Sequence, residues 1–193
     1  MRASPAEYLS LKLRAHELLR SVPLHDVSVV DLPGGGTGRS VADVRALQSS
    51  AGPGRIVGAF FGLRRLLGSA FGWDRVQMRP EDSLLAQLSA RDRTDSEIVP
   101  GTRDGPFRLL YQFPRESLSE IRNATVQGYV SIALAPTAAG YRLYWAVYVL
   151  PVSWLTGPYL LLIEPFRRFI VYPAMLGRIR RAWMARYHSD VFS

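Results

Sequence analysis

The apolar and polar positions along the chain separate a helical first part from a strand-rich second part. Apolar side chains recur at helical spacing over residues 6–20, and apolar and polar residues alternate over residues 25–32, as in a strand. A helix is predicted over residues 40–48, where the first residue is a Ser that suits the N-cap position. Two more helices are predicted over residues 56–71 and 81–88.

The second part of the chain predicts a set of antiparallel strands. Apolar and polar side chains alternate over residues 107–113. Further strand sequence covers residues 118–134 and 141–149, and residues 136–140 have the Pro and Gly content of a turn between them. These segments therefore predict a meander that has one apolar face.

A long helix is predicted from residue 154 to residue 187. Pro165 and Pro173 interrupt it, and each proline removes a backbone donor and crowds the preceding turn, so kinks or breaks are expected there. The uncharged run over residues 143–163 is long enough for a membrane span, which needs about 20 residues. Its first part is rich in aromatic and β-branched residues, and prolines cut its second part, so the pattern favours a strand, a break and the start of the helix.

This order of elements predicts a single α+β domain over residues 1–193, in which the terminal helix covers a curved antiparallel sheet and extra helices precede the sheet. The apolar face of the last two strands is expected to combine Val126, Val130, Ile132 and Leu134 with Leu143, Trp145, Val147 and Val149. The side chains expected to pack on that face from the helix are Leu162, Phe166, Phe169, Ile170, Leu176, Ile179 and Trp183.

Composition narrows the classes of function. The net charge is +8, and 23 of the 24 basic residues are Arg, but they are spread along the chain except for a denser stretch over residues 167–186. Nucleic-acid binding is not favoured, because such proteins usually gather basic residues on one face with stacking aromatics. The chain has no Cys, which excludes disulfides and thiolate nucleophiles. The first residues contain no continuous apolar core of a secretory signal, so a cytoplasmic location is expected.

Several stretches resemble an uncharacterised bacterial family known only as a domain of unknown function. They are HDVSVVDLPGGG at residues 25–36, FRLLYQFP at 107–114, SLSEIRNATV at 117–126, YRLYWAVYVLPVSWL at 141–155 and IEPFRRFIVYP at 163–173. That family is similar to the helix-grip superfamily, which includes START lipid-transfer domains, aromatic polyketide cyclases and the birch-pollen-allergen proteins. The resemblance implies a helix-grip fold with a pocket for a hydrophobic or amphipathic small molecule between the sheet and the C-terminal helix. It implies neither a reaction nor a cofactor.

Glu164 is the first candidate for chemistry, because it is the sole acid between Glu120 and Asp190. A carboxyl group that faces an apolar cavity has a raised pKa and can act as a general acid or base. The alternative is an ordinary helix-surface ion pair with Arg167 or Arg168.

Glu120 and Arg122 are two residues apart in a predicted strand and therefore point to the same side. Strict alternation places them in phase with Val130, on the side of the terminal helix, where they would orient the polar head of a ligand. A bulge near Asn123 would reverse this phase and turn both side chains to solvent.

Four aromatic residues complete the predicted ligand-binding set. Tyr111 and Trp145 lie on predicted inward faces of strands, and Phe60 and Phe61 lie on the helix predicted over residues 56–71. Each suits a pocket wall, although plain core packing explains the same positions.

The remaining motifs do not indicate catalysis. The stretch GGGTGRS at residues 34–40 follows a strand and precedes a helix, but it lacks the Lys of a P-loop and the third Gly of GxGxxG, so a turn with a helix cap is expected. His16, His25 and His188 do not have metal-site spacing, and no metal or cofactor is expected. His25 and Asp26 are adjacent in a strand and should point to opposite faces.

Three functions remain open from the sequence. The first is binding of a hydrophobic small molecule, and the second is a cyclase- or isomerase-like reaction in the same cavity with Glu164 or Glu120 as the proton-transferring group. The third is peripheral contact with an anionic membrane through the Arg-rich stretch at 167–186, with Trp183 and Tyr187 at the interface.

Overall fold

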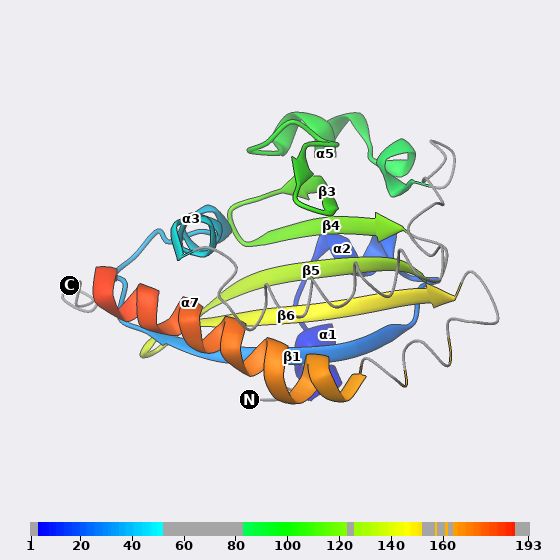
Figure 1. Ribbon diagram of the computed structural model, residues 1–193. Helices are drawn as coiled ribbons and strands as arrows, with labels where there is room; N and C mark the ends of the chain where they lie inside the picture. Colours follow the sequence, from blue (N-terminus) through cyan, green and yellow to red (C-terminus); the bar gives the residue numbers. More distant parts are fainter. Residues whose placement is uncertain are drawn as a thin grey trace.

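The structure, a computed structural model, describes residues 4–51, 83–122, 126–151, 157, 161 and 164–187. Six strands form one curved antiparallel sheet in the order β1-β6-β5-β4-β3-β2 (Figure 1). The strands are β1 (Leu24–Pro33), β2 (Arg103–Asp104), β3 (Phe107–Gln112), β4 (Glu116–Arg122), β5 (Val126–Thr137) and β6 (Gly140–Pro151). The strands that the sequence predicts are confirmed, and so is the α+β class. The two-residue strand β2 was not predicted.

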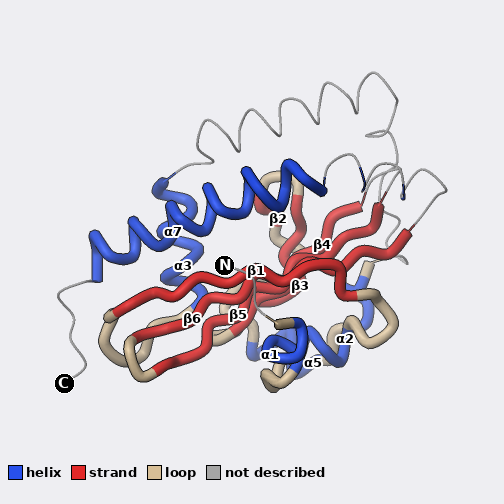
Figure 2. Tube along the Cα trace, turned by 90° about the horizontal axis from the view of Figure 1, so that it is seen from below, coloured by secondary structure: helices blue, strands red, loops and turns tan. Residues whose placement is uncertain are grey.

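Helices cover both faces of this sheet (Figure 2). On one face, here called the α7 face, lie α3 (Val41–Ala51) and the C-terminal helix α7 (Tyr172–Tyr187), which continues from the π-helical turn η4 (Arg167–Val171). The opposite face is called the α1 face. It is covered by α1 (Pro5–Leu9), α2 (Arg14–Leu18), the 3-10 turn η3 (Leu84–Gln87) and α5 (Ala90–Asp95). Two cores result, one on each side of the sheet.

The core of the α7 face follows the predicted alternation in β5 and β6. In the register of these strands Val130 lies opposite Val147, Ile132 opposite Trp145, and Leu134 opposite Leu143, so all six side chains share the α7 face. The helix side chains that pack against them, as expected, are Leu176, Ile179 and Trp183. The uncharged run at residues 143–163 therefore begins as the strand β6, paired by β1 on one edge and β5 on the other. Within the described ranges no helix has the length and apolar content that a bilayer crossing needs.

The start of the C-terminal helix departs from the predicted packing. Phe166, Phe169 and Ile170 were expected in the core, but they are 45%, 70% and 44% exposed. A regular helix would place Phe169 in line with Leu176, seven residues later, whereas the intervening π-helical turn has more residues per turn and shifts that phase. Leu162 lies outside the described residues.

The expected membrane-interface role of Trp183 and Tyr187 is also wrong, because both side chains are buried in the α7-face core. Trp183 is fully buried and donates a hydrogen bond from Nε1 to the Pro33 carbonyl oxygen at 3.1 Å. Tyr187 donates to Asp43 Oδ1 at 3.2 Å, and the guanidinium of Arg39 lies 3.9 Å from the centre of its ring.

The glycine-rich loop at residues 34–38 fits around Trp183. Gly35 has φ +96°, and a Cβ atom there would lie 2.6 Å from the Trp183 ring. Gly38 has φ +79°, and a Cβ atom there would meet open space. Close packing and left-handed backbone therefore explain these glycines, in agreement with the predicted turn. The following helix is also confirmed, and Asp43 accepts a hydrogen bond from the backbone N–H of Ser40 at 2.9 Å.

The α1 face was not anticipated as a second core. The helix predicted over residues 6–20 is two short helices, and the one predicted over 81–88 is the 3-10 turn η3 in its described part. Together with α5 they bury a second set of side chains, which includes Tyr8, Leu19, Val27, Leu110, Tyr111, Leu118 and Tyr148. The helix predicted over residues 56–71 lies outside the described residues.

Candidate functional site

A group of polar side chains gathers where the start of the C-terminal helix meets the start of β1. We call it the Glu164 cluster; its members are His25, Asp26, Glu164, Arg167 and Tyr172. His25 Nε2 donates a hydrogen bond to Glu164 Oε2 at 2.8 Å, and Arg167 Nη1 lies 3.7 Å from the same oxygen. Arg167 Nε donates to the Tyr172 hydroxyl at 2.9 Å. The predicted ion pair of Glu164 with Arg167 is confirmed, and the contact with His25 was not foreseen.

Two local irregularities assemble this cluster. The register of β1 against β6 shifts between Leu24 and Asp26, so His25 occupies a bulge and reaches Glu164 on the α7 face. Asp26 lies opposite Val147 and therefore faces the same side, which overturns the expectation that His25 and Asp26 point apart. In the helix, the π-helical turn brings residues five apart together, and Arg167 therefore reaches Tyr172.

The cluster is half-buried and carries both signs of charge. The side chains of His25 and Glu164 are each 27% exposed, that of Arg167 is 12% exposed, and Asp26 and Tyr172 are buried. Burial raises the pKa of the Tyr172 hydroxyl, and the nearby Arg167 opposes this rise. A carboxylate paired with an imidazole can pass a proton, and a guanidinium beside them can hold an anionic or hydroxyl group. The arrangement therefore suits the polar end of a ligand.

Glu120 and Arg122 do not join this cluster. Glu120 lies opposite Tyr129, and Arg122 opposite Gln127, so both face the α1 side; the predicted phase with Val130 is wrong. Strict alternation fails because β4 and β5 are separate strands, and the even positions of β4 pair with the odd positions of β5.

The alternative prediction, in which a bulge turns Glu120 to solvent, is also wrong. Glu120 is buried, accepts hydrogen bonds from Ser83 Oγ and from the Leu84 backbone N–H, and lies 3.9 Å from Arg108 Nη1. Burial raises the pKa of this carboxyl, although its hydrogen bonds lower it. Beside it an open cavity of about 220 Å³ is lined by Ser83, Leu85, Ala86, Arg93 and Arg108.

The predicted aromatic set is divided between the two faces. Trp145 lies on the α7 face opposite Ile132 and is partly buried, so its predicted inward face is confirmed. Tyr111 is fully buried in the core of the α1 face. Phe60 and Phe61 lie outside the described residues. Of the sequence-selected side chains that the structure describes, Glu164 and Trp145 are the two on the α7 face.

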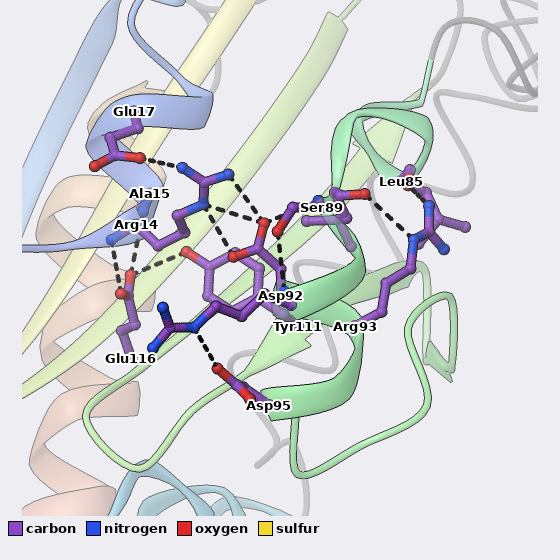
Figure 3. A network of polar contacts seen from close by, with 12 residues as sticks. Arg14, Ala15, Glu17, Leu85, Ser89, Asp92, Arg93, Asp95, Tyr111 and Glu116 are labelled. Atoms are coloured by element: carbon purple, nitrogen blue, oxygen red, sulfur yellow. Dashed lines mark hydrogen bonds and ion pairs between the residues drawn. The ribbon is translucent and has the colours of Figure 1, made fainter.

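Sequence reasoning missed a buried network on the α1 face, which is centred on Glu116 (Figure 3). The Glu116 carboxylate accepts hydrogen bonds from the backbone N–H of Arg14 at 2.7 Å, from that of Ala15 at 3.2 Å and from the Tyr111 hydroxyl at 2.9 Å. The Arg14 guanidinium in turn binds Asp92, with Nη2 to Oδ2 at 2.9 Å. Burial raises the pKa of Glu116, while its three donors and Arg14 lower it.

This network fastens α2 to the sheet and α5 to α2. Glu116 supplies an acceptor to the first amides of α2, where a helix favours negative charge, and Asp92 completes the capping box of α5 with Ser89. Each carboxylate is surrounded by protein donors, so the network acts as an anchor and leaves little to offer a ligand. The sequence does not indicate this role, because Glu116 looks there like an ordinary acid after the turn at Pro114 and Arg115.

Comparison with known proteins places the chain in a family. No curated protein matches it. A family model described as "Protein of unknown function (DUF2867)" matches residues 18–174, a range that contains the whole Glu164 cluster and excludes α1 and the anchoring Arg14. Because this match covers most of the 193 residues, it confirms the resemblance to a domain of unknown function, and the chain belongs to the DUF2867 family.

Proposed function

We propose that the protein binds an amphipathic small molecule between its sheet and its C-terminal helix, in the manner of the helix-grip superfamily to which its family is related in this proposal. The observation that carries this proposal is the Glu164 cluster, a half-buried group of His, Glu, Arg and Tyr at one end of an otherwise apolar layer. Ligand sites in proteins are typically apolar with a few convergent polar groups.

The apolar part of the proposed site begins beside the cluster. Val147 lies opposite Asp26 in the sheet, and Val130 and Val149 continue the apolar surface of the same face. Trp145 lies two residues before Val147 in β6, on the same face, and is partly buried. The apolar body of a ligand would contact these side chains, while its polar end would meet Arg167 and His25.

A fluorescence titration with 1-anilinonaphthalene-8-sulfonate tests this proposal, because the probe combines an aromatic body with an acidic group. The protein is expected to bind it saturably, and Glu164→Ala together with Arg167→Gln should weaken binding several-fold through loss of the polar end of the site. Asp95→Asn, which removes an exposed carboxylate on α5, is the matched control and should change nothing. Binding that is absent, or equally strong in the cluster variants, would contradict the proposal.

A second candidate function is proton-transfer catalysis in the same place. The specific observation in its favour is the 2.8 Å contact of His25 Nε2 with Glu164 Oε2, because such a pair can take and return a proton at a bound substrate. A compound that co-purifies with the protein would be incubated with it and followed by chromatography and mass spectrometry. Glu164→Gln should abolish conversion, whereas Glu120→Gln should leave it intact because Glu120 faces the other side of the sheet. Unchanged conversion in Glu164→Gln excludes this role.

A further inference from the structure

The start of the C-terminal helix exposes an unusual amount of apolar surface. Six large apolar side chains are exposed in the described part of the chain, and four of them lie within ten residues of one another: Leu161, Phe166, Phe169 and Ile170. The most exposed of these are Leu161 at 79% and Phe169 at 70%. Single exposed apolar residues are normal on protein surfaces, but several of them in one short segment indicate an interaction surface.

Basic side chains continue this surface along the helix. From Phe169 this side of the helix runs through the exposed Pro173 and the half-buried Gly177 to the exposed Arg180 and Arg181, at the spacing of three or four residues that keeps one side of a helix. The distance from Phe166 to Arg181 is about 22 Å at the rise of an α-helix. We call the exposed residues Leu161, Phe166, Phe169, Ile170, Pro173, Arg180 and Arg181 the docking strip.

The segment carries a strong excess of positive charge. Between residues 164 and 187 the chain carries six Arg and a single acid, Glu164. That acid is engaged by His25 and Arg167, so it does not offset the exposed guanidinium groups of Arg180 and Arg181. The other side of the same helix packs against the sheet through Leu176, Ile179 and Trp183.

We propose that the docking strip binds the surface of a bilayer that contains anionic lipids. A helix that lies in the plane of a membrane interface inserts aromatic and aliphatic side chains to the depth of the acyl boundary and sets arginines against the lipid phosphates. Phe166, Phe169 and Ile170 would be the inserted apolar side chains, and Arg180 and Arg181 would be the arginines that face the lipid phosphates. The aliphatic members favour acyl chains over nucleic acid, whose bases stack on aromatic rings.

This inference does not depend on the small-molecule site. The Glu164 cluster faces β1, whereas the docking strip faces away from the sheet, so the two can fail separately. A ligand site without membrane binding, or membrane binding without a ligand site, would each be visible in its own assay.

Co-sedimentation with vesicles tests the docking strip. Wild-type protein should sediment with vesicles of mixed phosphatidylglycerol and phosphatidylcholine, should bind phosphatidylcholine alone much less, and should lose most of its binding as salt is raised. The double variant Phe169→Ser, Ile170→Ser should reduce the bound fraction several-fold. The double variant Arg180→Gln, Arg181→Gln should weaken binding and flatten its salt dependence.

Two variants elsewhere serve as matched controls. Val99→Ser removes an apolar side chain that is 78% exposed, and Arg91→Gln removes a guanidinium that is 89% exposed, both away from the C-terminal helix. Neither should change vesicle binding. Failure of the wild type to bind anionic vesicles, or equal loss in Val99→Ser, would overturn the proposal. So would a wild-type dimer in solution that Phe169→Ser, Ile170→Ser converts to monomer, since the strip would then be a contact between copies of the chain.

Discussion

The two faces of the sheet use glutamate in opposite ways. On the α1 face Glu116 is 6% exposed and accepts hydrogen bonds from three protein donors, which fixes α2 to the strands. On the α7 face the side chain of Glu164 is 27% exposed and shares one oxygen between His25 and Arg167. A carboxylate enclosed by protein donors therefore stabilises the fold, whereas one with an exposed side can still accept a further hydrogen bond.

The largest effect on stability is expected within the C-terminal helix, which carries both buried and exposed aromatic residues. Trp183→Ala should lower the free energy of unfolding by about 3–5 kcal/mol, because it removes a fully buried side chain and its hydrogen bond to Pro33. Phe169→Ala on the same helix should change it by less than about 0.5 kcal/mol. Urea unfolding measures both. Similar losses in the two variants would mean that Phe169 is part of the core.

The two glutamates should differ in how much each contributes to stability. Glu116→Ala should cost about 2–4 kcal/mol, because it leaves the amides of Arg14 and Ala15 and the Tyr111 hydroxyl buried without their acceptor. Glu164→Ala should cost less than about 1 kcal/mol, as is usual for a partly exposed ion pair. Chemical denaturation of both variants at one pH provides the test. A larger loss for Glu164→Ala would assign the anchoring role to the wrong carboxylate.

A smaller effect should separate two glycines of the loop around Trp183. Gly35→Ala combines left-handed backbone with a Cβ atom 2.6 Å from the Trp183 ring, and it should cost about 2–3 kcal/mol. Gly38→Ala meets only the backbone strain, since nothing lies near its Cβ position, and should cost about 1 kcal/mol. Thermal unfolding of the pair measures the difference. Equal losses would show that contact with Trp183 contributes nothing.

The smallest effects are pH-dependent and have opposite signs within the Glu116 network. Burial raises the pKa of Glu116, so its contribution to stability falls as pH rises from the ordinary glutamate range through the raised value, and the deficit of Glu116→Gln should shrink over that interval. Burial also acts to raise the pKa of Asp92, but hydrogen bonds from Arg14 and Ser89 lower it below its usual range.

The contribution of Asp92 is therefore present above the ordinary aspartate pKa and is lost as pH falls through the lowered value. The deficit of Asp92→Asn should accordingly shrink toward acid pH. Denaturation curves collected across the acid range test both trends. Deficits that move in the same direction with pH would contradict the assignment.

The strands were predictable because their signal is local. Alternation in β5 and β6 identified the α7-face side chains, and the turn predicted between the two strands, which the structure places at residues 138–139, fixed how they pair. The face of Glu120 was not predictable, since it depends on how many residues separate β4 from β5, and a change of one residue reverses every side chain.

The candidate site was only partly visible in the sequence. Glu164 stood out as an isolated acid in apolar surroundings, and its pair with Arg167 follows from helical spacing. Its contact with His25 joins residues 139 positions apart and requires the bulge at the start of β1, which has no clear sequence signature. The anchor at Glu116 was hidden for a similar reason, because its donors Arg14 and Ala15 come from a distant helix.

Native mass spectrometry of the protein purified without detergent tests whether the α7 face holds an amphipathic ligand at the Glu164 cluster. Wild-type protein and the Glu120→Gln control should carry extra mass that is released on mild activation, and Glu164→Ala should carry much less. The recovered mass would indicate the chemical class of the ligand. Wild-type protein that shows its bare mass even after incubation with lipid extract, or equal occupancy in Glu164→Ala, would contradict the account.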